Sequence, residues 1–241
     1  MEAEQNRKQL VISCGMLSDE LKKAYQKCFS DCKILWMKRA LHNHPKNLKD
    51  TLQSLIDENQ DCDDILLTYG LCGNGTLGIH SQHTRLVIPK FHDCIHQLIQ
   101  SVDNYTADMD EPWKMNELGK INQKQVLPGQ LYLTRSWTLD QEAIYQQSKA
   151  VLNTYGKSHG QEILDEIYEG YTDINVINTD SYEIAPVMEY AKNAAAMNHL
   201  NVNQINGSTL ILEKLLCGDW DQNFIVLEPG EELQLNHFFN I

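Results

Sequence analysis

Short apolar segments alternate with amphipathic segments along this chain, and this alternation limits the possible folds more than any other feature of the sequence. The first apolar segments cover residues 10–14, 33–37, 64–68 and 85–88. Helix signals follow at 18–28 and 45–58, and a further helix is expected to begin near His92. A strand buried on both faces reads as a continuous apolar run, and a helix supplies the crossover between parallel strands. The pattern therefore predicts an α/β fold with a mainly parallel sheet and helices on both faces.

The alternation resumes after a poorly patterned stretch, which indicates two similar Rossmann-like lobes. Residues 102–130 have weak periodicity, mixed charge and several prolines and glycines, so they are predicted to form a linker or a lid. We then expect an N-terminal lobe at 1–101, which carries the metal site, and a C-terminal α/β lobe at 131–241. With 241 residues, the chain is also long enough to form one large domain.

Each of the first four predicted strands runs into a residue that can bind a metal ion. In chain order these residues are Cys14, His42, Cys72 and Cys94. Because the carboxyl ends of parallel strands open at one edge of a sheet, residues that are far apart in sequence converge there. Three thiols and an imidazole suit zinc or a [4Fe-4S] cluster. The sequence therefore predicts a metal site at this edge, with these four residues as ligands.

Two segments at this edge carry further candidate residues. His92-Asp93-Cys94 adds an imidazole and a carboxylate that can orient it, so we expect His92 and Asp93 to be catalytic groups. In the segment 69–75, the backbone is expected to approach a cofactor at Gly70, Gly73, Asn74 and Gly75. This loop matches neither the dinucleotide fingerprint nor the P-loop, so phosphate binding is a weaker alternative. A nucleophilic Cys72, activated by His92 and Asp93, is a third.

Each candidate also has a purely structural interpretation. Cys14 and Cys94 read as core thiols, and His42 as the cap of a turn. Four other histidines are expected on loops or helix surfaces with structural roles only, namely His44, His80, His83 and His96. No Cys-x2-Cys pair defines a metal geometry, so the predicted convergence depends on the strand assignments.

The cysteine pattern indicates reduced thiols. Seven cysteines, an odd number, are scattered over a chain of this size, and that is not typical of a secreted disulfide framework. Four of them lie on or beside apolar helix and strand positions and are expected to be small buried hydrophobic residues, namely Cys28, Cys32, Cys62 and Cys217.

The charge and hydropathy of the chain exclude several classes of partner. A formal net charge of -13 and a pI near 5.0 oppose binding to phosphate backbones, so nucleic acid is not an expected partner. No apolar run approaches the roughly 20 residues that cross a bilayer. The first eight residues are polar and of mixed charge, unlike a secretory signal. We therefore expect a cytoplasmic protein without membrane contacts that acts on a small molecule.

Five short motifs stand out along the chain, namely Leu41-His42 with Pro45, Tyr69-Gly70-Leu71-Cys72-Gly73-Asn74-Gly75, Pro89 with His92-Asp93-Cys94-Ile95, Leu133-Thr134 with Trp137, and Gly218-Asp219-Trp220 before Phe224. Together they resemble a family of unknown function, DUF1638, that is found mainly in anaerobic bacteria and methanogenic archaea. The genes of this family often lie near corrinoid-dependent methyltransferases. The resemblance therefore implies a role in anaerobic one-carbon, methyl-group or cofactor metabolism, and a corrinoid protein or a methyltransferase as partner.

Two functions from different classes follow from these observations. One is a metal-dependent enzyme, such as a methyltransferase or a lyase. The layout of its three thiols resembles that of quinolinate synthase, in which three cysteines hold a [4Fe-4S] cluster; with His42 or His92 as a fourth donor, the same set suits zinc. The other is a non-catalytic accessory protein that binds a corrinoid or another small ligand. The chain lacks the Asp-x-His-x-x-Gly motif of corrinoid proteins, so a corrinoid held by such a histidine is not expected.

Overall fold

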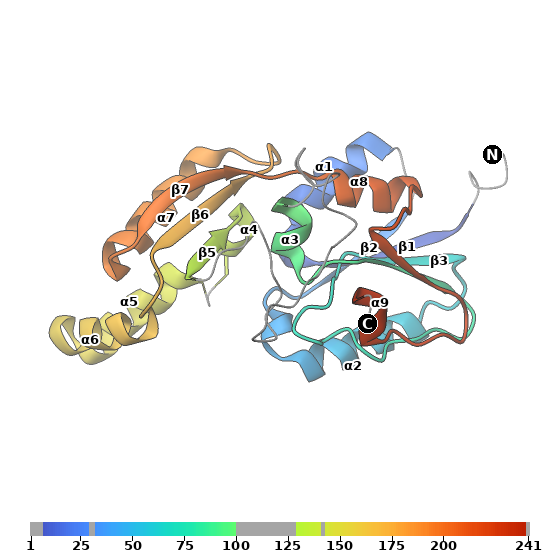
Figure 1. Ribbon diagram of the computed structural model, residues 1–241, viewed down its shortest axis with the longest axis horizontal. Coiled ribbons are helices and arrows are strands. Elements are labelled where there is room, and N and C mark those ends of the chain that lie inside the picture. The colour runs from blue at the N-terminus through green and yellow to red at the C-terminus, as the bar shows by residue number, and fades with distance from the viewer. Residues whose placement is uncertain (1–6, 29–31, 100–128, 141–142, 240–241) are drawn as a thin grey trace. The chain divides into compact units, whose positions relative to one another are not determined.

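The computed structural model describes residues 7–28, 32–99, 129–140 and 143–239 (Figure 1). Internal contacts divide the chain into two compact units. The first combines Met1–Asn122 with Thr209–Ile241, and the second is Gln123–Ser208. The predicted linker or lid at 102–130 lies almost entirely outside the described residues.

A five-stranded sheet forms the centre of the first unit. Its order is β2-β1-β3-β4-β8, and the strands are β1 (Gln9–Cys14), β2 (Lys33–Met37), β3 (Asp64–Leu67), β4 (Arg85–Pro89) and β8 (Phe224–Leu227). The first four are mutually parallel, and β8 pairs antiparallel with β4. All four residues of β3 are buried, whereas β2 lies at an edge and exposes Trp36. Burial on both faces explains the continuous apolar runs in the inner strands.

Helices cover this sheet as the alternation predicted. They are α1 (Ser18–Cys28), α2 (Pro45–Asp57), α3 (Cys94–Ile99), α8 (Leu210–Cys217) and α9 (Leu235–Phe238), with short 3-10 helices η1 (Gly15–Leu17) and η2 (Leu41–Asn43). Pro45 occupies the first turn of α2, where its missing N–H costs nothing. Leu48, Leu52 and Ile56 lie three or four residues apart on one face of α2, and all are fully buried. Figure 1 shows α1 and α8 on one side of the sheet and α2 on the other.

The second unit has a smaller parallel sheet. Its order is β5-β6-β7, and its elements are β5 (Gln130–Leu133), α4 (Arg135–Thr138), α5 (Ile144–Tyr155), α6 (Lys157–Ile167), β6 (Asp173–Asn178), α7 (Ile184–Asn198) and β7 (Asn201–Asn206). The core is formed by Ile174 and Val176 of β6 against Ala191 and Ala194 of α7. The small alanine side chains allow the helix to approach the sheet closely. Both sheets confirm the α/β class, mainly parallel and Rossmann-like.

After β7 the chain returns to the first unit. Residues 131–241 were expected to form one C-terminal lobe, but Thr209–Ile241 belongs to the first unit. β8 extends the first sheet through four residue pairs with β4, from Leu86 opposite Leu227 to Pro89 opposite Phe224. α8 packs on α1. The physical reason is that β4 has an open edge once β3 has paired with its other side, and the apolar β8 covers it.

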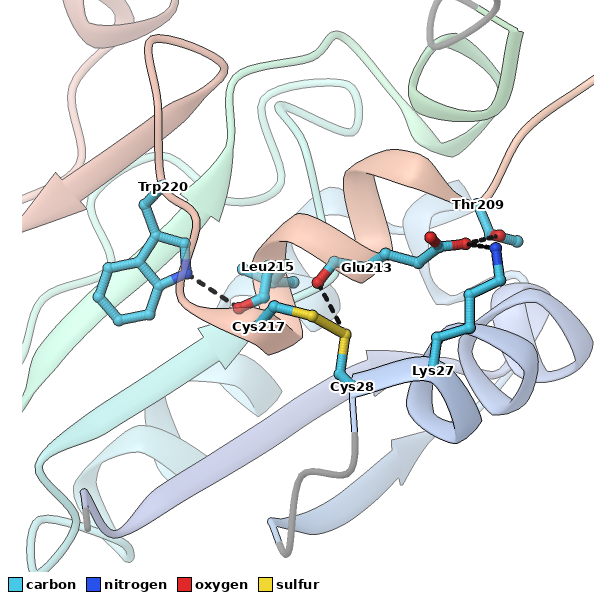
Figure 2. The surroundings of a disulfide bond; sticks show 7 residues. All are labelled: Lys27, Cys28, Thr209, Glu213, Leu215, Cys217 and Trp220. Carbon is cyan, nitrogen blue, oxygen red and sulfur yellow. Dashed lines mark hydrogen bonds and ion pairs between the residues drawn. A yellow bond between two sulfur atoms is a disulfide. The ribbon is translucent and has the colours of Figure 1, made fainter. Parts of the chain in front are cut away.

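Cys28 and Cys217 form a disulfide, so the expectation of reduced thiols was wrong for these two residues. The bond joins the last residue of α1 to the last residue of α8, across 189 positions of sequence (Figure 2). Cys28 Sγ also lies 3.1 Å from the carbonyl oxygen of Glu213. Packing of α8 on α1 brings together two cysteines whose pairing no local sequence pattern predicts. The other five cysteines are free thiols.

No helix within the described ranges is both long enough and apolar enough to cross a membrane.

Candidate functional site

The predicted ligands follow the parallel strands at the carboxyl edge of the first sheet. Cys14 is the last residue of β1, His42 lies in η2 after β2, and Cys72 follows β3 by five positions. Cys94 is the first residue of α3, after β4. The chain runs from β1 outward to β2 and then crosses back to β3, so the strand order reverses between β1 and β3. Such a switch point forms a crevice in parallel α/β sheets.

A buried polar network joins the strand ends at the switch point to α3. The Thr68 hydroxyl accepts a hydrogen bond from the N–H of Cys14 at 3.1 Å and lies 3.0 Å from the Ser13 hydroxyl. Gln97 of α3 donates to the carbonyl of Thr68 at 2.9 Å. These bonds satisfy buried groups and hold α3 against the ends of β1 and β3.

The loops after β3 and β4 are bonded to each other through their backbones. The N–H of Leu71 donates to the carbonyl of Phe91, and that of Cys72 to the carbonyl of His92, both at 2.8 Å. This approach requires a glycine at position 70, because a Cβ there would lie 2.2 Å from the Phe91 carbonyl oxygen. Cys72 is therefore held beside the His92-Asp93-Cys94 segment.

The glycine-rich loop has an unusual backbone around Cys72. Cys72, Gly73 and Asn74 have φ values of 47°, 64° and 69°, all in the left-handed region. Cysteine rarely adopts this conformation, and such residues concentrate at functional sites. A Cβ on Gly75 would meet Leu48 of α2 at 2.8 Å, so Gly75, like Gly70, is required by packing. Gly73 and Asn74 are exposed, so within the predicted cofactor-binding set these two residues are accessible to solvent.

His92, Asp93 and His96 bring three potential ligand atoms within 4.8 Å of one another. His96 Nδ1 lies 2.6 Å from Asp93 Oδ1, and His92 Nδ1 lies 3.5 Å from Asp93 Oδ2. Since a carboxylate only accepts, Nδ1 of His96 carries the proton in this contact. Asp93 Oδ1 also accepts the backbone N–H of His96 at 3.0 Å, as an N-cap residue does at the start of a helix.

The two histidines hold Asp93 in its charged form. Burial by itself would raise the pKa of the Asp93 carboxyl, but its hydrogen bonds with His92 and His96 outweigh burial and keep that pKa well below its ordinary value. Although enclosed by the two loops, the Asp93 side chain is 37% exposed, and that of His92 is 35% exposed. A carboxylate bonded to a histidine in this way orients the ring, as outer partners of metal ligands do.

Burial keeps the three thiols at this edge protonated. It raises the pKa of Cys14, of Cys72 and of Cys94. Negative charge at Cys14 would raise the pKa of Cys72 further, and charge at Asp93, Cys14 or Cys72 would do the same to Cys94. The three sulfurs are therefore electrostatic neighbours. A cysteine nucleophile is activated by surroundings that lower the pKa of its thiol, whereas these surroundings raise it. A bound cation would stabilise the thiolates.

The three predicted thiol ligands and His42 do not belong to the close set. Within the part of the chain that the structure describes, only His92, Asp93 and His96 bring ligand atoms together within 4.8 Å. His42 is half-buried in η2. The four residues follow parallel strands of the first sheet as expected, and their role as metal ligands stays a prediction.

Sequence reasoning missed His96, which was expected on a helix surface with a structural role only. The residue is 2% exposed, because α3 turns this side chain toward the protein. The spacing was a usable signal, since a helix expected to begin near His92 would place His92 and His96, four positions apart, on one face. Of the other three histidines, His44 and His83 are exposed, and His80 is half-buried.

The fold and this site define an α/β protein with histidine, aspartate and cysteine side chains, residue types that can bind metals, at the carboxyl edge of a parallel sheet. A family model described as "Protein of unknown function (DUF1638)" matches residues 36–216. This match covers more than half of the chain, so the protein belongs to the DUF1638 family. No curated protein and no solved structure matches the chain.

Proposed function

We propose that this protein is a metal-dependent enzyme that acts on a small molecule at the switch point of its first sheet. The observation that carries the proposal is the gathering of His92, Asp93 and His96 beside three thiols at one edge. Cysteine and histidine are the donors that zinc and iron–sulfur clusters use.

The donor set fits either group. Cys14, Cys72 and Cys94 are the soft ligands of the proposal. His92 is the imidazole best supported as a further ligand or as a proton-transfer group, because the Cys72 N–H is bonded to its carbonyl. His42 remains the alternative fourth ligand. Bound zinc or an open iron site would supply Lewis-acid chemistry to an oxygen or a sulfur of the substrate.

The remaining groups position these donors. Asp93 orients both histidines, and its contact with His96 is the shorter of the two. The partly exposed His92 can reach a substrate and hold or release a proton, while Gln97 and Thr68 keep α3 in register with the strand ends. Anaerobic one-carbon or cofactor metabolism, inferred from the family resemblance, is the context in which we propose to seek the substrate.

Metal analysis of the anaerobically purified protein tests the proposal. Elemental analysis and an absorption spectrum distinguish zinc from an iron–sulfur cluster. We expect Cys72→Ser to lose most of the bound metal, since a hydroxyl is a poor ligand for transition metals at neutral pH. The matched control is Cys62→Ser, a half-buried thiol that precedes β3 at the opposite edge, and it should keep its metal.

Two results would contradict the proposal. One is less than about 0.1 equivalent of any transition metal after anaerobic reconstitution, because a folded site of this kind binds its metal tightly. The other is equal loss of metal in both variants. A protein that bound a corrinoid, with its cobalt, but neither zinc nor an iron–sulfur cluster would instead be an accessory protein.

A further inference from the structure

Arg39 is a cation at the carboxyl edge of the first sheet, and no carboxylate among the described residues pairs with it. It lies between β2 and η2, and its Nε is buried without a hydrogen-bond partner in the same part of the chain. Other arginines of this acidic chain are paired: Arg7 and Arg85 contact Asp64 at 3.2 Å and 2.8 Å. A guanidinium with a buried unpaired donor is costly unless a ligand completes it.

The position of Arg39 places it at the end of β1, where Cys14 is located. A Cβ on Gly15, the residue after Cys14, would lie 3.1 Å from Arg39 Cγ and 2.9 Å from the Met37 carbonyl oxygen. The missing side chain at position 15 thus makes room for the arginine stem. The charge of Arg39 also acts on Cys14: burial raises the pKa of this thiol, and the guanidinium partly offsets the rise.

Tyr69 supplies a buried hydroxyl at the same switch point. It is 2% exposed, and its hydroxyl donates a hydrogen bond to the Cys14 sulfur, which is a weak acceptor. Burial raises the pKa of Tyr69 well above its ordinary value, and the neighbouring thiols Cys14, Cys72 and Cys94 raise it further. The hydroxyl therefore lies among the thiols, where a ligand oxygen would be a stronger acceptor for its hydrogen bond than the Cys14 sulfur.

We infer that Arg39 and the Tyr69 hydroxyl bind the carboxylate group of a small organic acid beside the thiols of the crevice. The inference rests on the proposed function and assigns a class to its substrate. A guanidinium matches a carboxylate in shape and charge, and the phenol donates one more hydrogen bond. A single arginine balances a single negative charge. The first turn of α1, which follows Cys14 in the chain, carries Asp19 and the fully buried Glu20, and this negative charge disfavours a phosphate dianion more than a carboxylate.

The test compares two neighbouring cations in the full-length protein. Arg39→Gln removes the proposed ligand-binding charge, and Lys38→Gln removes the same charge from the adjacent exposed position. Sodium acetate, sodium succinate and inorganic phosphate are titrated at constant ionic strength, with binding followed by calorimetry and by the shift of the melting temperature. We expect the carboxylates to bind, with Kd about 10- to 100-fold weaker in Arg39→Gln, as the loss of a charged hydrogen bond predicts. Lys38→Gln should leave Kd within about twofold.

Tyr69→Phe gives a second, independent measurement. Because the Cys14 sulfur is only a weak acceptor for this hydroxyl, its removal should weaken carboxylate binding and change the melting temperature of the free protein little. Arg39→Lys retains the charge and serves as the folded alternative if Arg39→Gln does not fold; its carboxylate binding should also be weaker, because lysine lacks the planar fork of donors.

Three results would overturn the inference: no binding of either carboxylate by the wild type, equal weakening in Arg39→Gln and Lys38→Gln, or binding of phosphate alone. Metal content is measured on the same samples and should be unchanged by Arg39→Gln. If the wild-type protein contains no metal but still binds carboxylates through Arg39, the proposed metal chemistry is excluded and the carboxylate-binding site stands.

Discussion

Asp93 shows how one side chain can serve both the fold and the site. Its Oδ1 accepts from the backbone N–H of His96 and from the ring of the same residue. The first bond caps α3, and the second fixes the ring orientation. Asp93 can therefore have a structural and a functional role at the same time, because a metal or proton-transfer site needs oriented histidines.

Asp93→Ala should lower the free energy of unfolding by about 1–3 kcal/mol at neutral pH, since it removes a helix cap and a charged hydrogen bond. The pKa of Asp93 is lower in the folded state than its ordinary value of 3.8, so the carboxylate stabilises the fold above that value and loses this effect as the pH falls through the folded pKa. The stability gap between wild type and variant should therefore narrow between about pH 5 and about pH 2. Urea unfolding at several pH values measures the gap.

The control is Asp50→Ala, an exposed carboxylate on α2, which should change stability by less than about 0.5 kcal/mol. If the gap between wild type and Asp93→Ala widened as the pH fell below about 4, the charge of Asp93 would not stabilise the fold.

At the scale of elements, the cross-link between α1 and α8 is the main feature that local patterns did not predict. It is reinforced by polar contacts: Lys27 Nζ lies 2.6 Å from Glu213 Oε1, and the same carboxylate accepts the Thr209 hydroxyl (Figure 2). Trp220 donates to the carbonyl of Leu215 at 2.9 Å, next to the disulfide. Both cysteines lie outside the residues that match the family model, 36–216.

Replacing both Cys28 and Cys217 with serine should destabilise the first unit by about 2–5 kcal/mol, because the unfolded chain regains the freedom of a long closed loop. Urea unfolding followed by the tryptophan fluorescence of the protein, with and without dithiothreitol, measures the effect. Reductant should destabilise the wild type and leave the double variant unchanged. Equal responses of the two proteins to reductant would show that the disulfide does not stabilise the fold.

At the scale of the whole molecule, the chain leaves the first unit, forms the second and returns. The C-terminal return contributes an edge strand, β8, and a helix packed on α1. Because β8 is paired with β4, the strand that leads into the His92–Cys94 segment depends on residues more than 130 positions away. The stability of the site edge is therefore linked to the last part of the sequence.

Leu227→Ala tests this dependence in the intact chain. Leu227 is 2% exposed on β8, and its truncation should cost the first unit about 2–4 kcal/mol. The adjacent Val226 is 37% exposed, so Val226→Ala should cost less than about 1 kcal/mol. In Leu227→Ala, hydrogen exchange should accelerate at β4 and stay unchanged at β6. Acceleration at β6 alone would assign the C-terminal segment to the second unit.

The sequence by itself determined the order of strands and helices, because the periodicity of apolar residues reports which face of each element is buried. It also located Cys14, His42, Cys72 and Cys94 after parallel strands, since chain direction alone decides at which edge a strand ends. Only the tertiary structure decided the pairing of β8 with β4, the Cys28–Cys217 bond, the burial of His96, and the buried Arg39 Nε that no described residue satisfies. These depend on packing between distant segments, whose energies are set by three-dimensional contacts that no local pattern contains.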